Sequence, residues 1–323
     1  MKYPIEFERM PLEPGEIEAN IFSIAQDSTG FIWISSSEAI YRYDGYNFKK
    51  FTIDNKPVAY GSAMLIVVDS HNNVWVKLKK NTLVKYDPVS DQFIKAIETP
   101  NQRIVGMVCI EDTIWLCSKY SRLYKYIPSI MELTCVIDTS QIKYHTNCMI
   151  ADNKDLWIGC NNGIYKYNSD NGVLNFYCPE IRQNNSLVGR FISLNRDEAG
   201  DIWASSHFGS IFKYNREKDI FEHFFTLPGI DWSHPKYEII SSICQDTTSI
   251  WLGTTHKGIG FLNRSTKNIL FSTESPEMIS GISRKNIHRL FIDKSGTIWV
   301  GTMRPGLFKQ KKRSKFQRFL LPT

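Results

Sequence analysis

Short apolar runs recur along the chain, and each has the length of a buried β-strand rather than of a helix. The most regular runs centre on a tryptophan with an apolar residue on each side. Seven tryptophans repeat in this way at intervals of 40 to 48 residues: Trp33, Trp75, Trp115, Trp157, Trp203, Trp251 and Trp299. Because such a run is apolar on both faces, the strand must be covered on both faces.

The residues around each tryptophan predict three further strands. An acidic residue lies four to six positions earlier, often in a turn with Gly or Asn, which is typical of a hairpin. An apolar strand precedes this turn. An alternating strand such as Tyr41-Arg42-Tyr43 follows the tryptophan, and a variable fourth strand such as Phe48–Phe51 comes after it. Four strands per repeat of this length indicate an all-β, seven-bladed β-propeller that occupies residues 1–323 as one domain.

The ends of the chain offer two candidates for closing the ring. The segment 5–10 precedes the first blade and is expected to pair as the outer strand of the seventh blade, which removes an exposed sheet edge. The segment 316–319 competes for the same place. The repeat length argues against a β-helix, which has much shorter periods. The seven tryptophans are interpreted as core between blades, without a role in binding.

Composition narrows the class of protein. The chain has 323 residues and a net charge of +6, without the clustered basic face that nucleic-acid binding requires. The run 310–315 is interpreted as a charged hairpin. Seven cysteines contain no C-x-x-C pair, so we predict buried thiols with no metal site, cofactor or disulfide framework. No apolar run reaches the length of about 20 residues that spans a membrane.

The repeat resembles the two-component regulator propeller repeat. The resemblance is carried by two segments in particular, Gln26-Asp27-Ser28-Thr29-Gly30-Phe31-Ile32-Trp33-Ile34 and Asp293-Lys294-Ser295-Gly296-Thr297-Ile298-Trp299-Val300-Gly301-Thr302. It extends to all seven repeats, and the third departs most because its turn is shortened.

The resemblance implies a periplasmic sensor domain of a hybrid two-component histidine kinase of the Bacteroides type. Its ligand would be an oligosaccharide from glycan breakdown. Its partners would be the remaining receptor domains, namely a second propeller, a β-sandwich, a membrane helix and a kinase, and a homodimer is compatible with the full receptor. The chain would be a non-enzymatic part, with its signal peptide trimmed.

A ligand is expected at one end of the ring. In a four-stranded blade (strands A to D from the inside outward), the A–B and C–D hairpins lie at one end and carry the acidic residues. The B–C loops and D–A crossovers lie at the other end and are basic and aromatic, which favours an acidic ligand. The candidate binding residues are Lys79, Lys119, Tyr120, Arg122, Arg190, His207, Phe208, Trp232, His256, Lys257 and Arg304.

Two other functions remain open at this point. The propeller could be a protein-interaction or dimerisation scaffold that binds no small ligand. It also resembles, at a distance, the streptogramin-lyase-like propellers, which use His and Glu around a metal. His207 and His256 occupy equivalent loops of adjacent blades, but two histidines without a third ligand are weak evidence for such a site.

Overall fold

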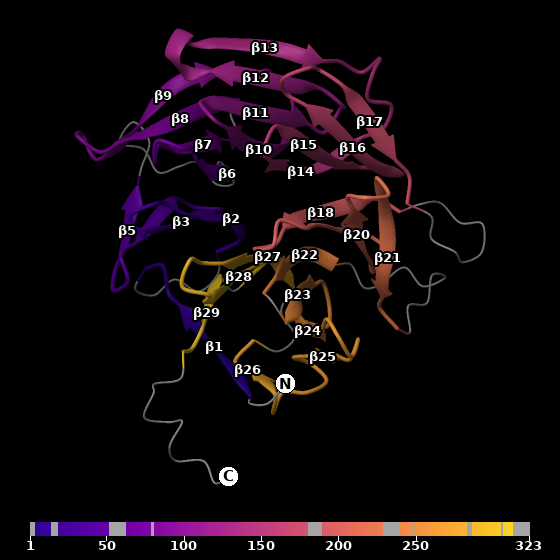
Figure 1. Ribbon diagram of the computed structural model, residues 1–323. Helices are drawn as coiled ribbons and strands as arrows, with labels where there is room; N and C mark the ends of the chain where they lie inside the picture. The colour runs from indigo at the N-terminus through magenta and orange to yellow at the C-terminus, as the bar shows by residue number, and fades with distance from the viewer. Residues whose placement is uncertain are drawn as a thin grey trace.

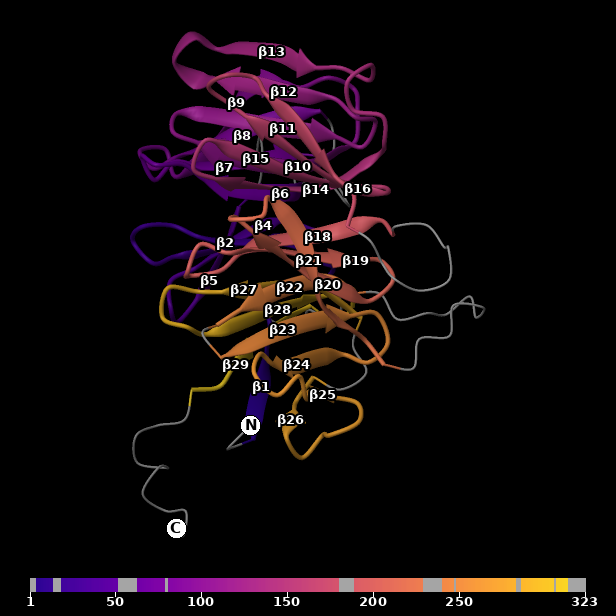
Figure 2. The same ribbon diagram turned by 45° about the vertical axis from the view of Figure 1, so that its right-hand side comes forward.

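The computed structural model describes residues 4–13, 19–51, 63–78, 81–179, 189–228, 240–246, 248–282, 286–304 and 306–312. Their strands form seven separate sheets, six of four strands and one of five, and all pairings are antiparallel except one in the five-stranded sheet. Figures 1 and 2 show these sheets arranged in chain order around a common centre. The predicted seven-bladed propeller is confirmed. The described residues contain one short 3₁₀ helix, Pro128–Ile130, and no helix long and apolar enough to cross a membrane.

In the first six blades, the strands follow one another from the inside outward. The first three blades are β2 (Ile21–Gln26), β3 (Ile32–Ser36), β4 (Ile40–Tyr43) and β5 (Phe48–Phe51); β6 (Ala63–Val68), β7 (Val74–Leu78), β8 (Thr82–Asp87) and β9 (Gln92–Glu98); and β10 (Ile104–Ile110), β11 (Thr113–Ser118), β12 (Leu123–Ile127) and β13 (Glu132–Ile137). The next three are β14 (Thr146–Asp152), β15 (Asp155–Cys160), β16 (Gly163–Asn168) and β17 (Leu174–Tyr177); β18 (Phe191–Arg196), β19 (Ile202–Ser206), β20 (Ser210–Asn215) and β21 (Ile220–Thr226); and β22 (Ile240–Gln245), β23 (Ser249–Thr254), β24 (Ile259–Asn263) and β25 (Ile269–Phe271).

The seventh blade combines both ends of the described chain. Its inner three strands are β27 (Ile287–Ile292), β28 (Ile298–Thr302) and β29 (Leu307–Gln310), and its fourth strand is β1 (Ile5–Met10). β1 pairs antiparallel with β29, and on its other side it pairs in parallel with the short β26 (Ile279–Ser280). Figure 1 shows β1 in indigo beside the yellow β29. The competing segment 316–319 lies outside the described residues.

The core lies between the blades. Each of the seven tryptophans has at most 2% of its surface exposed, which confirms their assignment to the core. All residues of β3, β7, β19, β23 and β28 are buried, as expected for a second strand that is covered on both faces. The thiols are less uniform than predicted, because Cys135 and Cys178 are exposed while Cys117, Cys160 and Cys244 are buried.

The acidic residue of the repeat has a second role besides forming the turn. In five blades its carboxylate accepts a hydrogen bond from the indole Nε1 of the tryptophan in the next strand, at 2.8 to 3.2 Å: Asp27–Trp33, Asp69–Trp75, Asp197–Trp203, Asp246–Trp251 and Asp293–Trp299. Trp115 and Trp157 have no partner for Nε1. In their blades the turn has two residues. Glu111 lies in its turn and Asp152 just before its own, and these carboxylates instead bind Lys154 and Arg196.

Candidate functional site

A repeated backbone contact builds the B–C/D–A end of the ring. The first residue after each second strand donates its N–H to the carbonyl of the residue just before the inner strand. The observed pairs, at 2.6 to 2.9 Å, are Ser37–Asn20, Lys119–Arg103, Asn161–His145, His207–Arg190 and Met303–Asn286. Because the inner strands surround the central channel, this contact places Lys119, Arg190 and His207 at the mouth of that channel.

Blades 3 to 5 bring four basic side chains together at this mouth, and we call Arg103, Lys119, Arg190 and His207 the basic cluster. Burial lowers the pKa of Lys119, and the charges of Arg190 and Arg103 lower it further. Burial also lowers the pKa of His207, with a second contribution from Arg190. Lys119 Nζ donates to Asn147 Oδ1 at 2.7 Å, so it bonds to an amide oxygen rather than to a carboxylate. The cluster therefore concentrates positive charge.

Two aromatic candidates flank the basic cluster. The ring of Tyr120 is 55% exposed and lies 5.6 Å from that of His145 in an edge-to-face contact. The ring of Phe208 lies 5.7 Å from that of His207. Phe208 also packs on the backbone of Gly189, where an added Cβ would come within 2.3 Å of its Cδ2 atom. Glycine at this position therefore seats the phenyl ring at the channel mouth.

The other candidates contact residues of their own blades. The positive charge of Arg122 acts on Asp138 and Cys135 at the outer strand of blade 3. Lys257 forms an ion pair with Glu274 at 2.9 Å and lies over the Phe271 ring at 4.9 Å. Arg304 is exposed and has a positive φ of 55°. Lys79 and Trp232 lie outside the described residues, so their assignment stays a prediction.

The predicted equivalence of His207 and His256 is wrong by one residue. His207 follows the last residue of β19 directly, whereas Thr255 holds that place after β23. His256 instead corresponds to Phe208, and its Nδ1 lies 2.8 Å from Thr255 Oγ1. Among the described residues, no three His, Cys, Asp or Glu side chains come together in a way that could hold a metal ion.

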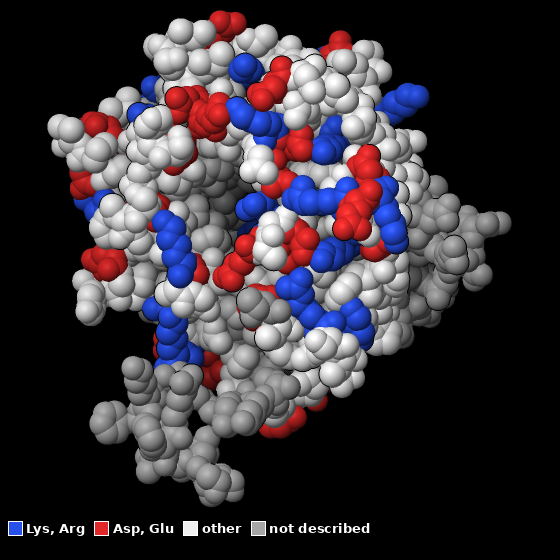
Figure 3. Space-filling model, in the orientation of Figure 1, with Lys and Arg blue, Asp and Glu red and all other residues white. Residues whose placement is uncertain are grey.

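The hairpin end of the ring is not the acidic surface that the sequence predicted. Its aspartates pair with basic side chains from neighbouring blades. Asp152 binds both Arg196 at 2.8 Å and Arg216 at 2.7 Å, and Asp197 binds Arg264 at 3.0 Å. Figure 3 looks onto this end and shows basic and acidic side chains interleaved around a central hollow. The two ends of the ring therefore differ less in charge than the sequence predicted.

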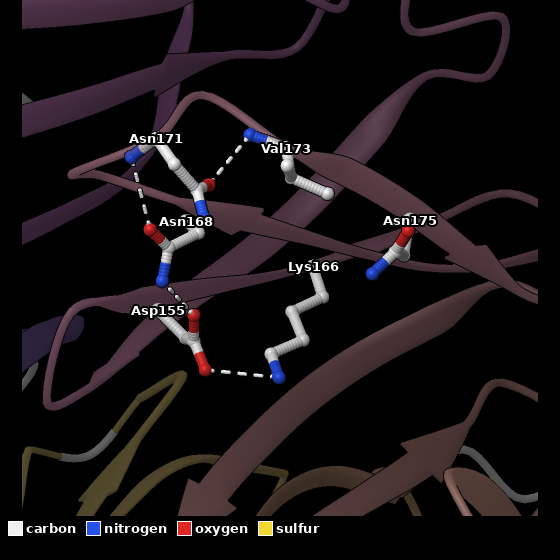
Figure 4. Close-up of a pocket in the computed structure, with 6 residues that line it drawn as sticks. All are labelled: Asp155, Lys166, Asn168, Asn171, Val173 and Asn175. Atoms are coloured by element: carbon white, nitrogen blue, oxygen red, sulfur yellow. Dashed lines mark hydrogen bonds and ion pairs between the residues drawn. The ribbon is translucent and has the colours of Figure 1, made fainter.

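A small pocket on the outer half of blade 4 is a structural network (Figure 4). Its volume is about 230 Å³, and Asp155 is one of the residues that line it. Asp155 binds Lys166 Nζ at 3.0 Å and Asn168 Nδ2 at 2.8 Å. Asn171 in turn accepts the N–H of Val173 at 3.0 Å and shapes the turn between β16 and β17. These side chains satisfy one another, so the pocket offers no reactive group.

The central channel contains a charged residue that the sequence reasoning missed. Arg289 stands in the middle of β27, and its Nε donates to the carbonyl of Phe22 on β2 at 2.8 Å. It lines a cavity of about 410 Å³ between the inner strands of blades 5, 6 and 7. Its neighbour His288 bonds through Nδ1 to the carbonyl of Ile21 at 2.9 Å, and burial lowers the pKa of this histidine to about 4. His288 and Arg289 are polar residues within an otherwise apolar strand, and this break in the sequence pattern could have identified them.

The chain is similar to a propeller repeat family and to solved structures of two extracellular domains. Residues 15–38 and 281–304 match the two component regulator propeller family. The extracellular domain of the putative hybrid two component system BT4673 from B. thetaiotaomicron is 20% identical, with a TM-score of 0.76 over 97% of this chain. That of BT3049 is 18% identical, with a TM-score of 0.71 over 96%. The chain spans only 40% and 42% of these two structures.

The same fold occurs in an enzyme. Virginiamycin B lyase from Staphylococcus aureus is 14% identical, with a TM-score of 0.73, and the match covers 96% of this chain and all of the lyase. No curated protein sequence matches the chain. The family match falls on the first and last blades, the two segments that carried the resemblance in the sequence. The chain is therefore a seven-bladed propeller whose first and last blades match the two component regulator propeller repeat.

Proposed function

We propose that this chain is the ligand-sensing, extracytoplasmic part of a two-component signalling receptor. Its ligand would be an oligosaccharide released by glycan breakdown, and the candidate site is the B–C/D–A end over blades 3 to 5. The observation that carries this proposal is the basic cluster at the channel mouth, flanked by Tyr120 and Phe208. No catalytic step is part of the proposal.

The chemistry of this surface suits an acidic sugar. Exposed aromatic rings provide flat apolar faces, and Tyr120 presents such a face beside His145. Arginine binds a carboxylate or sulfate through paired N–H donors, and Arg103 and Arg190 supply two such groups at the inner-strand starts of blades 3 and 5. Several positive charges around a concave mouth also attract an anion by focusing the electrostatic field.

The receptor context is supported by relatives. The similar structures are described as extracellular domains of hybrid two component systems, and they are more than twice as long as this chain. We therefore propose a periplasmic location and further receptor domains as partners, with the propeller providing recognition and those domains providing the signal output.

A thermal-shift and calorimetric screen tests this function. The chain is titrated with neutral and acidic glycan fragments of matched length, and a ligand that binds the folded state raises the unfolding temperature by mass action. Lys119→Gln and Arg190→Gln are each expected to weaken an acidic ligand at least tenfold, because each loses a charge-assisted hydrogen bond. Lys95→Gln is the control, since Lys95 pairs with Glu98 on the outer strand β9.

Three outcomes separate the functions. Binding of acidic fragments that depends on Lys119 and Arg190 supports the proposal, and binding of neutral fragments alone excludes the acidic ligand. An absence of any glycan binding favours a protein-interaction scaffold. The full-length likeness to the lyase makes catalysis the second candidate. Cleavage of a streptogramin, together with stoichiometric metal in the purified protein, would establish that alternative.

A further inference from the structure

The channel holds a partly buried cation to which the described residues supply no counter-charge. Arg289 lies within the ring at the third position of β27, and its Nε bonds to a neutral carbonyl. The structure gives its Nη donors no acceptor among the described residues. A guanidinium drawn partly out of water without a counter-charge is costly, because desolvation removes water that stabilises the charge. An arginine in this position therefore calls for an anion from elsewhere.

The inner strands supply no such anion. The seven strands β2, β6, β10, β14, β18, β22 and β27 contain a single acidic residue, Asp152 at the last position of β14. Both of its carboxylate oxygens are already bound, one by Arg196 and the other by Arg216. Asp152 also stands at the hairpin end, whereas Arg289 stands near the start of its strand.

A second cation acts on the same buried thiol as Arg289. Burial raises the pKa of the Cys148 thiol to about 12. The positive charges of Arg289 and Lys119 act on the same thiol in the opposite direction and lower its pKa. Cys148 is on β14 of blade 4, which is three places from blade 7 in a ring of seven and therefore across the channel. The Arg289 side chain thus extends into the channel, toward the wall where Lys119 bonds to Asn147.

We propose that the central channel is an oxyanion site in which Arg289 is the main ligand and Lys119 supports it from the opposite wall. The ligand group is a carboxylate or a sulfate, either as the acidic substituent of a sugar or as a free anion. The cavity of about 410 Å³ lined by Arg289 has the size of a small-molecule site, which is typically ~300–1,000 Å³. The hydroxyl side chains of Ser193 and Ser242 also line this cavity. Three carboxylates line it toward the hairpin end: Asp197 binds Arg264, Asp293 is held within its own turn, and Glu198 is exposed.

This proposal deepens the function proposed above and rests on it only for the sugar part. Galactose and galacturonate form the matched pair of probes, since they differ in the carboxylate alone. Sodium sulfate tests a free anion, with sodium chloride at the same ionic strength as the reference. Binding to the whole chain is measured by calorimetry and by the unfolding temperature. Because sulfate stabilises folded proteins in general, the difference between wild type and variant is the quantity of interest.

We expect galacturonate or sulfate to bind the wild type and galactose to bind at least tenfold more weakly. Arg289→Met should abolish the difference between the acid and the neutral sugar. Lys119→Gln should weaken the acid about tenfold, the loss of one charge-assisted hydrogen bond. Lys95→Gln, which removes an equal charge from the outer surface, should change nothing. Arg289→Lys keeps the charge and replaces Arg289→Met if the latter does not fold; it should retain weakened, acid-selective binding.

The outcomes distinguish the two proposals. Acid binding that survives in Arg289→Met, or no binding of any anion to the wild type, overturns the channel site. Arg289-dependent binding of sulfate or galacturonate without binding of longer glycans keeps the channel site and rejects the glycan sensor. Glycan binding that is unchanged in Arg289→Met supports the glycan sensor and rejects the channel site. A structural arginine that only holds the Phe22 carbonyl predicts a lower unfolding temperature in Arg289→Met, by the same amount with and without anion.

Discussion

The buried aspartate of blade 7 offers a quantitative test of how the hairpin turns hold the blades. Asp293 is 9% exposed, and its Oδ1 accepts hydrogen bonds from Ser295 Oγ at 2.6 Å and from the N–H groups of Ser295 and Thr297 at 2.9 Å. Its Oδ2 accepts Trp299 Nε1 at 2.9 Å. We expect Asp293→Ala to destabilise the folded chain strongly.

The magnitude follows from these four contacts. The three bonds within the turn are worth about 1 kcal/mol each, and water can replace part of them once the side chain is removed. The buried Trp299 N–H has no such replacement and costs about 1–3 kcal/mol when it is left without an acceptor. The expected loss in the free energy of unfolding is therefore about 3–5 kcal/mol. Asp293→Asn should lose less, because an amide oxygen can keep the turn bonds.

Urea unfolding followed by tryptophan fluorescence measures this loss. Glu111→Ala is the matched control, since Glu111 has the same place in the repeat but pairs with the exposed Lys154 instead of a tryptophan. It should cost less than about 1 kcal/mol. A double-mutant cycle with Trp299→Phe should show a coupling of about 1–2 kcal/mol between carboxylate and indole. A coupling near zero would refute the argument that this hydrogen bond contributes to stability.

Three further predictions concern stability and pH. Burial lowers the pKa of Lys77 to about 8, so between about pH 8 and 10.5 the unfolded chain binds a proton that the folded chain has lost, and the stability of the folded chain should rise with pH. Lys77→Met should remove that rise and stabilise the chain by about 2–3 kcal/mol at pH 7, which urea titrations at several pH values will measure. Burial alone would raise the pKa of Asp293, but hydrogen bonds lower it, and hydrogen bonds from tyrosines lower that of Asp219. The pKa values of both carboxyls in the folded state lie below the unfolded value of 3.8. Their contribution to the free energy of unfolding should therefore be complete above that pH and disappear as acid protonates the folded state, and urea unfolding at pH 2–5 will measure this. Gly163→Ala should cost about 1–3 kcal/mol in urea unfolding, because the new Cβ would lie 2.4 Å from the carbonyl of Tyr177.

The architecture could be predicted because the same physical requirement recurs in all seven repeats. A strand buried on both faces needs apolar residues at every position, and a tryptophan at its centre makes the period visible. The closing strand was also predictable, since Ile5–Met10 has a strand pattern and no place in the first blade. These conclusions depend on local composition and spacing, which a sequence displays directly.

The site was harder to predict because it depends on which blades face each other. The neutralisation of Asp152 by Arg196 and Arg216 joins residues 44 and 64 positions apart, so the hairpin end looked acidic from the sequence alone. Arg289 looked like one of many basic residues until the structure placed it in the channel. The hydrogen bond from Trp33 to Asp27 could have been anticipated, because a spacing of six recurs in four of the five blades that form it.

The pairing of β1 with β29 has a consequence for how the chain folds. Glu6 contacts Lys311 across 305 residues of sequence, so β1 can take its place in blade 7 only after the last strands of the propeller exist. Until then, blades 1 to 6 form an open arc, and Phe7 lacks the part of its core that blade 7 supplies, such as Leu290 and Phe308. Contacts this far apart slow folding and lengthen the life of aggregation-prone intermediates. Ring closure should therefore be the slow final event of folding, and a loss of β1 should be felt first in the refolding yield.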